Sequence, residues 1–180
     1  LVLAGLAPAS AVDRSLRAKC AEASNGPDQA IQHCTAIIDD RTEQSADHFA
    51  AYLNRARAYF AKRLWDRSVV DYDAAIGLFP DVAESYNERG TAHDRQGDIA
   101  RAISDFSTAI RIDPSNARAY GNRGLTHFRN AARDLALSDF NEAIRLAPAY
   151  SVAYNGRGVI RAMNGDTKEA IADFTEAIRL

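Results

Sequence analysis

Apolar, small and aromatic residues recur along most of the chain in steps of three and four. Counted so that Ala83 is position 1, they occupy positions 4, 8 and 11, and then positions 20, 24, 27 and 28. This spacing places them on one face of a helix, so the stretch predicts two amphipathic helices, over positions 1 to 14 and 17 to 30. Gly97 lies between them and can adopt the left-handed conformation that ends a helix.

The same pattern occurs four times at a spacing of 34 residues. Its most similar part is a hexapeptide, which reads AYLNRA from Ala51, SYNERG from Ser85, AYGNRG from Ala119 and AYNGRG from Ala153. Pro80, Pro114 and Pro148 close successive units at position 32. The predicted units are residues 49–82, 83–116 and 117–150, and a truncated unit at 151–180. One helical hairpin cannot bury its apolar face alone, so we expect an all-α fold of stacked antiparallel helical hairpins.

The sizes of the repeated residues predict how the helices meet. Position 8 is always small, and position 24 always carries a ring: Ala56, Gly90, Gly124 and Gly158, and Tyr72, Phe106, Phe140 and Phe174. Rings that lie beside small residues interlock, and we expect them to fill the seam between one hairpin and the next.

Taken together, these features resemble the tetratricopeptide repeat family. The shared pattern is the period, an aromatic residue at position 4, Gly at 8, Ala at 20, Phe at 24, Ala at 27 and Pro at 32, and it covers residues 49–180. The resemblance implies a right-handed α-solenoid whose first helices line a concave groove for an extended peptide or a partner helix. The groove candidates are Asn54, Arg57, Glu84, Asn87, Glu88, Thr91, Asp94, Arg118, Asn122, Arg129 and Asn155. The family's carboxylate clamp of Lys, Asn and Arg is absent, because position 5 is never Lys and position 9 is never Asn.

One departure from the family pattern is present in every unit. Position 7 carries Arg where the family prefers Leu, and position 23 carries Asp. The guanidinium group can bind a carboxylate through two hydrogen bonds, so we predict a structural ladder of ion pairs, each within one hairpin or between neighbours. An anion-binding ladder is the alternative. The residues are Arg55, Asp71, Arg89, Asp105, Arg123, Asp139, Arg157 and Asp173.

Residues 12–40 contain a fainter version of the repeat, and residues 41–48 are interpreted as a linker or the start of the next helix. The segment DQAIQHCTAIID, from Asp28, is similar to ARAISDFSTAIRID, so we predict a divergent N-terminal hairpin with Cys34 where the ring usually lies. Cys20 and Cys34 are the only cysteines. We expect a disulfide, which would stabilise the fold by about 3 kcal/mol; reduced core thiols and metal ligands are the alternatives.

The two ends of the sequence carry further predictions. Residues 1–11, LVLAGLAPASA, are uncharged and end in the small residues Ala9, Ser10 and Ala11, which is typical of a signal-peptide remnant with its cleavage site. A frayed leader or the end of a buried helix is the alternative. We therefore expect a periplasmic or secreted protein without membrane insertion after signal removal. No closing Pro follows Leu180, so we expect the natural chain to continue.

Charge and motifs narrow the function classes. The chain has 22 basic and 24 acidic residues without a basic run, which gives no electrostatic support for a nucleic-acid partner. Phosphate-binding loops, nucleophile elbows and metal-binding H-E-x-x-H motifs are absent, so we expect no cofactor, no metal and no enzyme activity. His93 and His127 share position 11 and are interpreted as packing residues.

These observations predict a non-catalytic scaffold that binds a protein or peptide ligand. The alternatives are the N-terminal recognition array of a longer secreted enzyme and a cytosolic scaffold, for which Cys20 and Cys34 would be free thiols.

Overall fold

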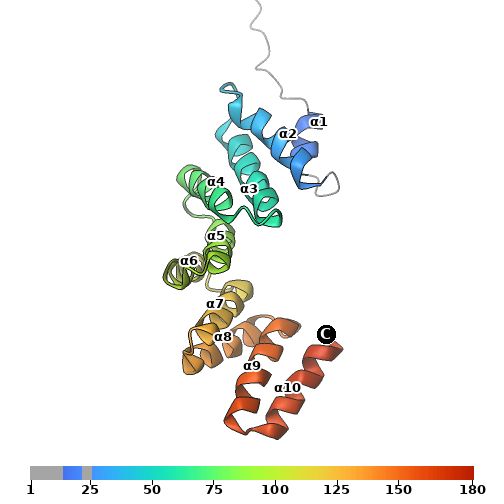
Figure 1. The fold of residues 1–180 in the computed structure, drawn as a ribbon, viewed down its shortest axis with the longest axis vertical. Helices are drawn as coiled ribbons and strands as arrows, with labels where there is room; N and C mark the ends of the chain where they lie inside the picture. Colours follow the sequence, from blue (N-terminus) through green and yellow to red (C-terminus); the bar gives the residue numbers. More distant parts are fainter. Residues whose placement is uncertain (1–13, 22–25) are drawn as a thin grey trace, which may run out of the picture. The chain divides into compact units, whose positions relative to one another are not determined.

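A computed structural model describes residues 14–21 and 26–180 of the protein. These residues form ten α-helices, arranged as consecutive antiparallel pairs (Figure 1). The chain divides into two compact units, one ending at Pro80 and the other beginning at Asp81. The predicted signal-peptide remnant, residues 1–11, lies outside the described residues.

The first unit contains two hairpins. They consist of α1 (Arg14–Ala21), α2 (Pro27–Asp39), α3 (Ser45–Ala61) and α4 (Trp65–Leu78). Each helix packs against the next, and α1 also contacts α3. Helix α3 begins ahead of Phe49, where the repeat pattern predicts its start. The cause lies in the sequence, because this hairpin has Ala46 where the later ones have Pro80, Pro114 and Pro148, and proline disfavours helix in the residue before it.

The second unit contains three hairpins whose helices begin and end close to the predicted positions. They are α5 (Ala83–Gln96), α6 (Ile99–Ile112), α7 (Ala117–Arg129), α8 (Arg133–Leu146), α9 (Ser151–Asn164) and α10 (Thr167–Arg179). Successive helices pack against one another, and the first helices of neighbouring hairpins also touch, α5 with α7 and α7 with α9. The stack of hairpins that the repeat predicts is therefore present within this unit.

The turn inside each of the four hairpins from α3 to α10 contains a left-handed residue. Gly97 and Gly165 have φ angles of 84° and 90° and end α5 and α9. Arg63 and Ala131 occupy the same place in their hairpins with φ angles of 58° and 59°. A side chain raises the energy of this conformation, so the fold tolerates strain at two of its turns.

Aromatic rings and glycines fill the seams of the second unit. A Cβ atom added to Gly90 would lie 2.9 Å from Phe106 Cε1, and one added to Gly124 would lie 2.9 Å from Phe140 Cε1. These contacts lie inside one hairpin rather than between hairpins. The Phe140 ring also reaches Gly156 of the following hairpin, where an added Cβ would overlap it. The Phe140 ring therefore packs inside its own hairpin and also against the following hairpin.

A disulfide between Cys20 and Cys34 joins α1 to α2. Both cysteines are buried and pack with Ile37 and Ala51, so the disulfide belongs to the core of the first unit. Among the described residues, no helix combines the length and the apolar composition needed to cross a membrane.

Candidate peptide-binding surface

The structure contains all four Arg–Asp pairs, each joining the two helices of one hairpin. In the hairpin of α7 and α8, Arg123 Nε donates to Asp139 Oδ2 at 3.0 Å and Nη2 donates to Asp139 Oδ1 at 2.7 Å. The other three pairs have the same two-bond geometry. The four carboxylates are buried, so each of these four hairpins contains a buried charge that is paired with its own arginine through two hydrogen bonds. Asp173 also accepts a hydrogen bond from Arg161.

Arg55, Arg123 and Arg157 also bind the preceding hairpin. The remaining nitrogen, Nη1, donates to a polar side chain on the second helix of that hairpin: Arg55 to Thr35 at 2.9 Å, Arg123 to Ser107 at 3.1 Å and Arg157 to Asn141 at 2.7 Å. Sequence reasoning did not identify these acceptors. The signal was present, because position 25 is polar in all four units.

The planar face of each arginine is also occupied. The guanidinium carbons of Arg55, Arg89, Arg123 and Arg157 lie 5.4 to 5.7 Å from the ring centres of the tyrosines three residues before them. The hydrogen bond to Asp71 raises the pKa of Arg55 above its ordinary value. In Arg55, Arg123 and Arg157, the nitrogens Nε, Nη1 and Nη2 and the face of the guanidinium group all have partners within the protein. These side chains therefore link neighbouring helices and do not form an open anion site.

The histidines at position 11 lie beside the same carboxylates. His93 Nε2 is 3.9 Å from Asp105 Oδ2, and His127 Nε2 is 3.9 Å from Asp139 Oδ2. Burial lowers the pKa of His127, which favours its neutral form. In α9 the same position carries Arg161, whose Nη1 donates to Asp173 Oδ2 at 2.7 Å. Position 11 therefore packs against the ladder, as predicted for the two histidines.

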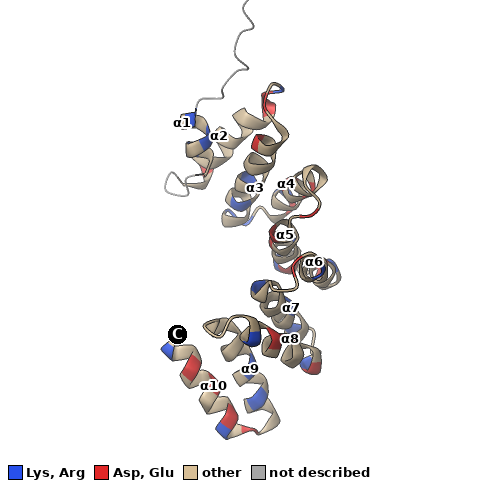
Figure 2. Cartoon of the chain, turned by 180° about the vertical axis from the view of Figure 1, so that it is seen from behind, with Lys and Arg blue, Asp and Glu red and all other residues tan. Residues whose placement is uncertain are grey.

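Polar contacts join α5 to α7 along the surface that sequence analysis assigned to the groove. They are Arg118 with Glu84 at 3.0 Å, Asn122 Nδ2 with Asn87 Oδ1 at 3.0 Å, Thr126 Oγ1 with Asp94 Oδ1 at 3.0 Å, and Arg129 with Asp94. Basic and acidic positions are scattered over the helices (Figure 2), and α7 itself carries arginines and no acidic residue. Several groove candidates thus hold neighbouring hairpins together. Asn87 is only 1% exposed, so its side chain accepts a hydrogen bond from Asn122 and does not face a ligand.

A pocket of about 240 Å³ lies on the same surface. Phe106, Leu125 and Phe128 provide its apolar part, and its polar lining consists of Thr91, Asp94, Arg95, Asn122 and Arg129. Four of these polar residues were groove candidates. Phe106 and Phe128 were not, because a residue that packs in the core and also lines a pocket carries no separate sequence signal.

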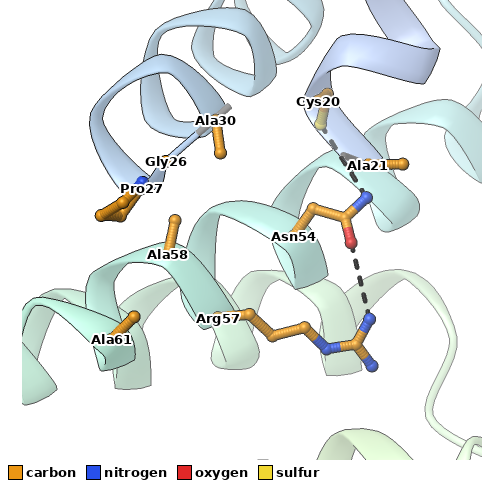
Figure 3. Close-up of a pocket in the computed structure, with 9 residues that line it drawn as sticks. All are labelled: Cys20, Ala21, Gly26, Pro27, Ala30, Asn54, Arg57, Ala58 and Ala61. Carbon is orange, nitrogen blue, oxygen red and sulfur yellow. Dashed lines mark hydrogen bonds between the residues drawn. The ribbon is translucent and has the colours of Figure 1, made fainter. Parts of the chain in front are cut away.

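The first unit has its own pocket, of about 360 Å³, between α3 and the N-terminal hairpin (Figure 3). Asn54 and Arg57, both groove candidates, line it together with Cys20, Pro27 and several alanines. Asn54 Nδ2 lies 3.9 Å from Cys20 Sγ, and Arg57 Nη1 donates to Asn54 Oδ1 at 3.5 Å. Two predicted residues therefore meet in a pocket next to the disulfide.

The remaining groove candidates lie apart from these pockets. Glu88 lies on α5, and Asn155 is exposed on α9. Asn155 lines a hollow with Val152, Phe174 and Ile178 at the end of the second unit. Of the eleven candidates, Asn54 and Arg57 belong to the first unit and the others to the second.

The repeat pattern has a known counterpart. The Tetratricopeptide repeat family model matches residues 15–83, 53–117, 87–151 and 122–180. The chain belongs to the tetratricopeptide repeat family. No protein of curated function matches its sequence.

Solved tetratricopeptide repeat structures share the fold. MamA 41-end from Desulfovibrio magneticus RS-1 is 17% identical, with 93% of this chain and 92% of that chain covered and a TM-score of 0.78. A crystal structure of MamA is 22% identical, covers 85% and 87%, and has a TM-score of 0.73. The second tetratricopeptide repeat domain of Spaghetti (RPAP3), bound to the HSP90 peptide SRMEEVD, is 31% identical over 55% of this chain and 92% of that chain, with a TM-score of 0.53.

Proposed function

We propose that this tetratricopeptide repeat protein is a non-catalytic interaction scaffold that binds a peptide or a partner helix on the surface formed by α5 and α7. The observation that carries this proposal is the pocket lined by Phe106, Leu125 and Phe128. Its volume of about 240 Å³ suits one apolar side chain of a ligand rather than a whole cofactor.

The polar lining of the pocket supplies hydrogen bonds for a peptide backbone. Asn122 donates its amide hydrogen to Asn87, so its carbonyl oxygen remains oriented to accept from a ligand N–H. Thr91 Oγ1 donates to the carbonyl oxygen of Asn87 at 2.9 Å and keeps lone pairs to accept. Because these groups are held by contacts within the protein, binding would order few side chains and lose little conformational entropy.

Relatives support peptide binding as the general mode. The second tetratricopeptide repeat domain of Spaghetti binds an HSP90 peptide. This chain lacks the Lys–Asn–Arg clamp pattern, so the proposed recognition depends on an apolar anchor and backbone hydrogen bonds instead of a terminal carboxylate.

We also propose that the protein acts outside the cytoplasm, in the periplasm or after secretion. The small-residue pattern at Ala9 to Ala11 and the Cys20–Cys34 disulfide support this location together, because disulfides persist in oxidising compartments. Alkylation of protein taken directly from source cells tests it. Modification of both cysteines without prior reduction would contradict the exported location.

Crosslinked pull-down from the source cells tests the binding surface. Thr91→Lys places a charged chain in the pocket, whereas Ala100→Lys adds the same charge at an exposed site on α6 outside it. We expect partners captured by the wild type to be lost with Thr91→Lys and retained with Ala100→Lys, while circular dichroism shows both variants folded. Identical partner sets for the wild type and both folded variants would contradict the proposal.

A further inference from the structure

Two arginines line the pocket between α5 and α7, and neither uses all of its hydrogen-bond donors within the protein. Arg95 lies on the last turn of α5 and is exposed. Its side chain has no hydrogen-bond or ion-pair partner among the residues that the structure describes. A cation is stabilised at this end of a helix by the helix dipole, which explains why an unpaired arginine is tolerated there. Its guanidinium group is therefore available to a ligand.

Arg129, on the last turn of α7, is held at one of its three nitrogens. Its Nη2 donates to Asp94 Oδ1 and lies 3.5 Å from Thr126 Oγ1. Within the described part of the chain, Nε and Nη1 have no partner. The Arg129 side chain is 49% exposed. The contact with Asp94 therefore fixes the position of the guanidinium group and leaves two nitrogens to donate to an acceptor on a ligand.

The acidic residue of the pocket cannot balance both arginines. Asp94 carries the only carboxylate among the lining residues, and its side chain is 8% exposed. It already accepts hydrogen bonds from Thr126 Oγ1 and from Arg129. Further along α5, Glu84 is bound to Arg118. Two arginines and one aspartate give the pocket a net positive charge next to its apolar side, so an anionic group on a ligand is attracted to it.

We propose that this pocket recognises an internal segment of a partner protein in which an acidic side chain flanks the apolar anchor. The anchor lies against Phe106, Leu125 and Phe128, and the carboxylate accepts hydrogen bonds from Arg95 and Arg129. This inference rests on the function proposed above, because it names the chemistry of a ligand for the same surface. Charge complementarity carries it: the pocket combines an apolar side with cationic donors that lack a full set of partners.

The hydrogen-bond acceptors of the pocket favour an internal segment over the end of a chain. Asn122 Oδ1 and Thr91 Oγ1 are available to accept, because Asn122 Nδ2 and the Thr91 hydroxyl hydrogen are both donated to Asn87. An internal segment offers a backbone N–H on each side of its anchor, whereas a C-terminal anchor brings carboxylate oxygens close to these acceptors. The protein's own residues 1–12 contain no acidic residue, so they do not supply the carboxylate.

Three synthetic peptides with the same leucine anchor test the proposal on the full chain. The acidic probe is Gly-Ser-Asp-Leu-Asp-Ser-Gly with both ends blocked, the neutral probe has asparagine in place of both aspartates, and the terminal probe ends in Ser-Asn-Leu with a free carboxylate. Binding is followed by NMR of the Leu125 methyl groups. We expect the acidic probe to bind about fivefold more tightly than the neutral probe at low salt, and the difference to shrink as salt is added. The terminal probe should bind no more tightly than the neutral one.

Variants of one pocket arginine test the source of the preference for the acidic probe. Arg95→Gln should bring the affinities of the acidic and neutral probes to within about twofold of each other, because one of the two cations is removed. Arg95→Lys keeps the charge and should retain a larger difference than Arg95→Gln. Arg111→Gln is the matched control, because it removes an exposed arginine at the other end of the α5–α6 hairpin, outside the pocket. It should leave the preference unchanged.

The neutral probe separates this inference from the function on which it rests. If the acidic and neutral probes bind at Leu125 with equal affinity, the surface still binds peptides, but the arginines serve only the helix ends and the inference is overturned. A preference that survives Arg95→Gln unchanged also overturns it. Tighter binding of the terminal probe than of the acidic probe overturns the assignment to an internal segment. If no probe shifts the Leu125 signals, the proposed function is contradicted together with the inference.

Discussion

The N-terminal hairpin and the hairpin of α5 and α6 both pack against a following hairpin, but different residues fill their interiors. In the hairpin of α5 and α6, Phe106 fills the seam against Gly90. In the N-terminal hairpin, Cys34 occupies the place of the ring and is bonded to Cys20. Both nevertheless present a hydroxyl group to the arginine of the following hairpin, Thr35 to Arg55 and Ser107 to Arg123. A repeat must therefore keep its surface toward the next hairpin, whereas the way it closes itself can change.

The burial of α1 explains why the closure differs. Of the residues that the structure describes in α1, only Cys20 is buried, whereas α5 buries five. Packing alone therefore holds α1 less firmly than α5. A covalent bond to α2 compensates, because it limits the freedom of the unfolded chain independently of buried area.

Breaking the shared ladder should have the largest effect. Arg123→Leu leaves the buried Asp139 carboxylate without its two-bond partner, and we expect a loss of about 3–5 kcal/mol in the free energy of unfolding. Denaturant unfolding followed by circular dichroism measures it. Adding Asp139→Leu removes the stranded charge and should restore part of the stability. A double variant no more stable than Arg123→Leu alone would show that the pairing is not the cause.

Removing the Cys20–Cys34 disulfide, which belongs to the N-terminal hairpin, should have the next largest effect on stability. With Cys20→Ser and Cys34→Ser combined, we expect a loss of about 3 kcal/mol from the local stability of the first unit. Hydrogen exchange should become faster in α1 and α2 and stay unchanged in α7 and α8. Equal acceleration throughout the chain would contradict the view that the disulfide acts locally.

The ring-and-glycine seam can be tested with one substitution at two sites. Gly124→Ala inserts a methyl group against Phe140, and we expect a loss of about 1–3 kcal/mol. Gly77→Ala is the matched control, because an added Cβ at Gly77 meets nothing within 4 Å. It should stabilise α4 by up to about 1 kcal/mol through helix propensity alone. Thermal unfolding of both variants gives the comparison, and the same sign for both would refute the seam.

The smallest effect is expected at the strained turn between α7 and α8. Ala131→Gly removes the cost of a left-handed alanine and should stabilise the protein by about 1 kcal/mol. Gly97→Ala, at the equivalent turn after α5, should be destabilising for the same reason. Melting temperatures test both. A lower melting temperature for Ala131→Gly would mean that the alanine side chain stabilises the turn in another way.

The sequence predicted the helices and the ladder because both follow from short-range regularities. Spacing by three and four residues defines a buried helix face, and the 34-residue period shows that Arg at position 7 and Asp at position 23 recur together in all four units. The surface was harder to predict. Asn87 reads as a polar groove residue in the sequence, yet it is buried under Asn122. Its environment depends on how closely α5 and α7 approach.

The sequence by itself determined the number of repeats, the limits of most helices and which arginines and aspartates are available to form the ladder. Each of these depends on distances along a single chain or between equivalent positions of a periodic pattern. Only the tertiary structure decided that Nη1 of Arg123 reaches Ser107, that Phe106 and Phe128 line one pocket, and that Asn87 is buried. These features depend on how neighbouring helices are oriented, and side-chain size and packing set that orientation without leaving a separate mark in the sequence.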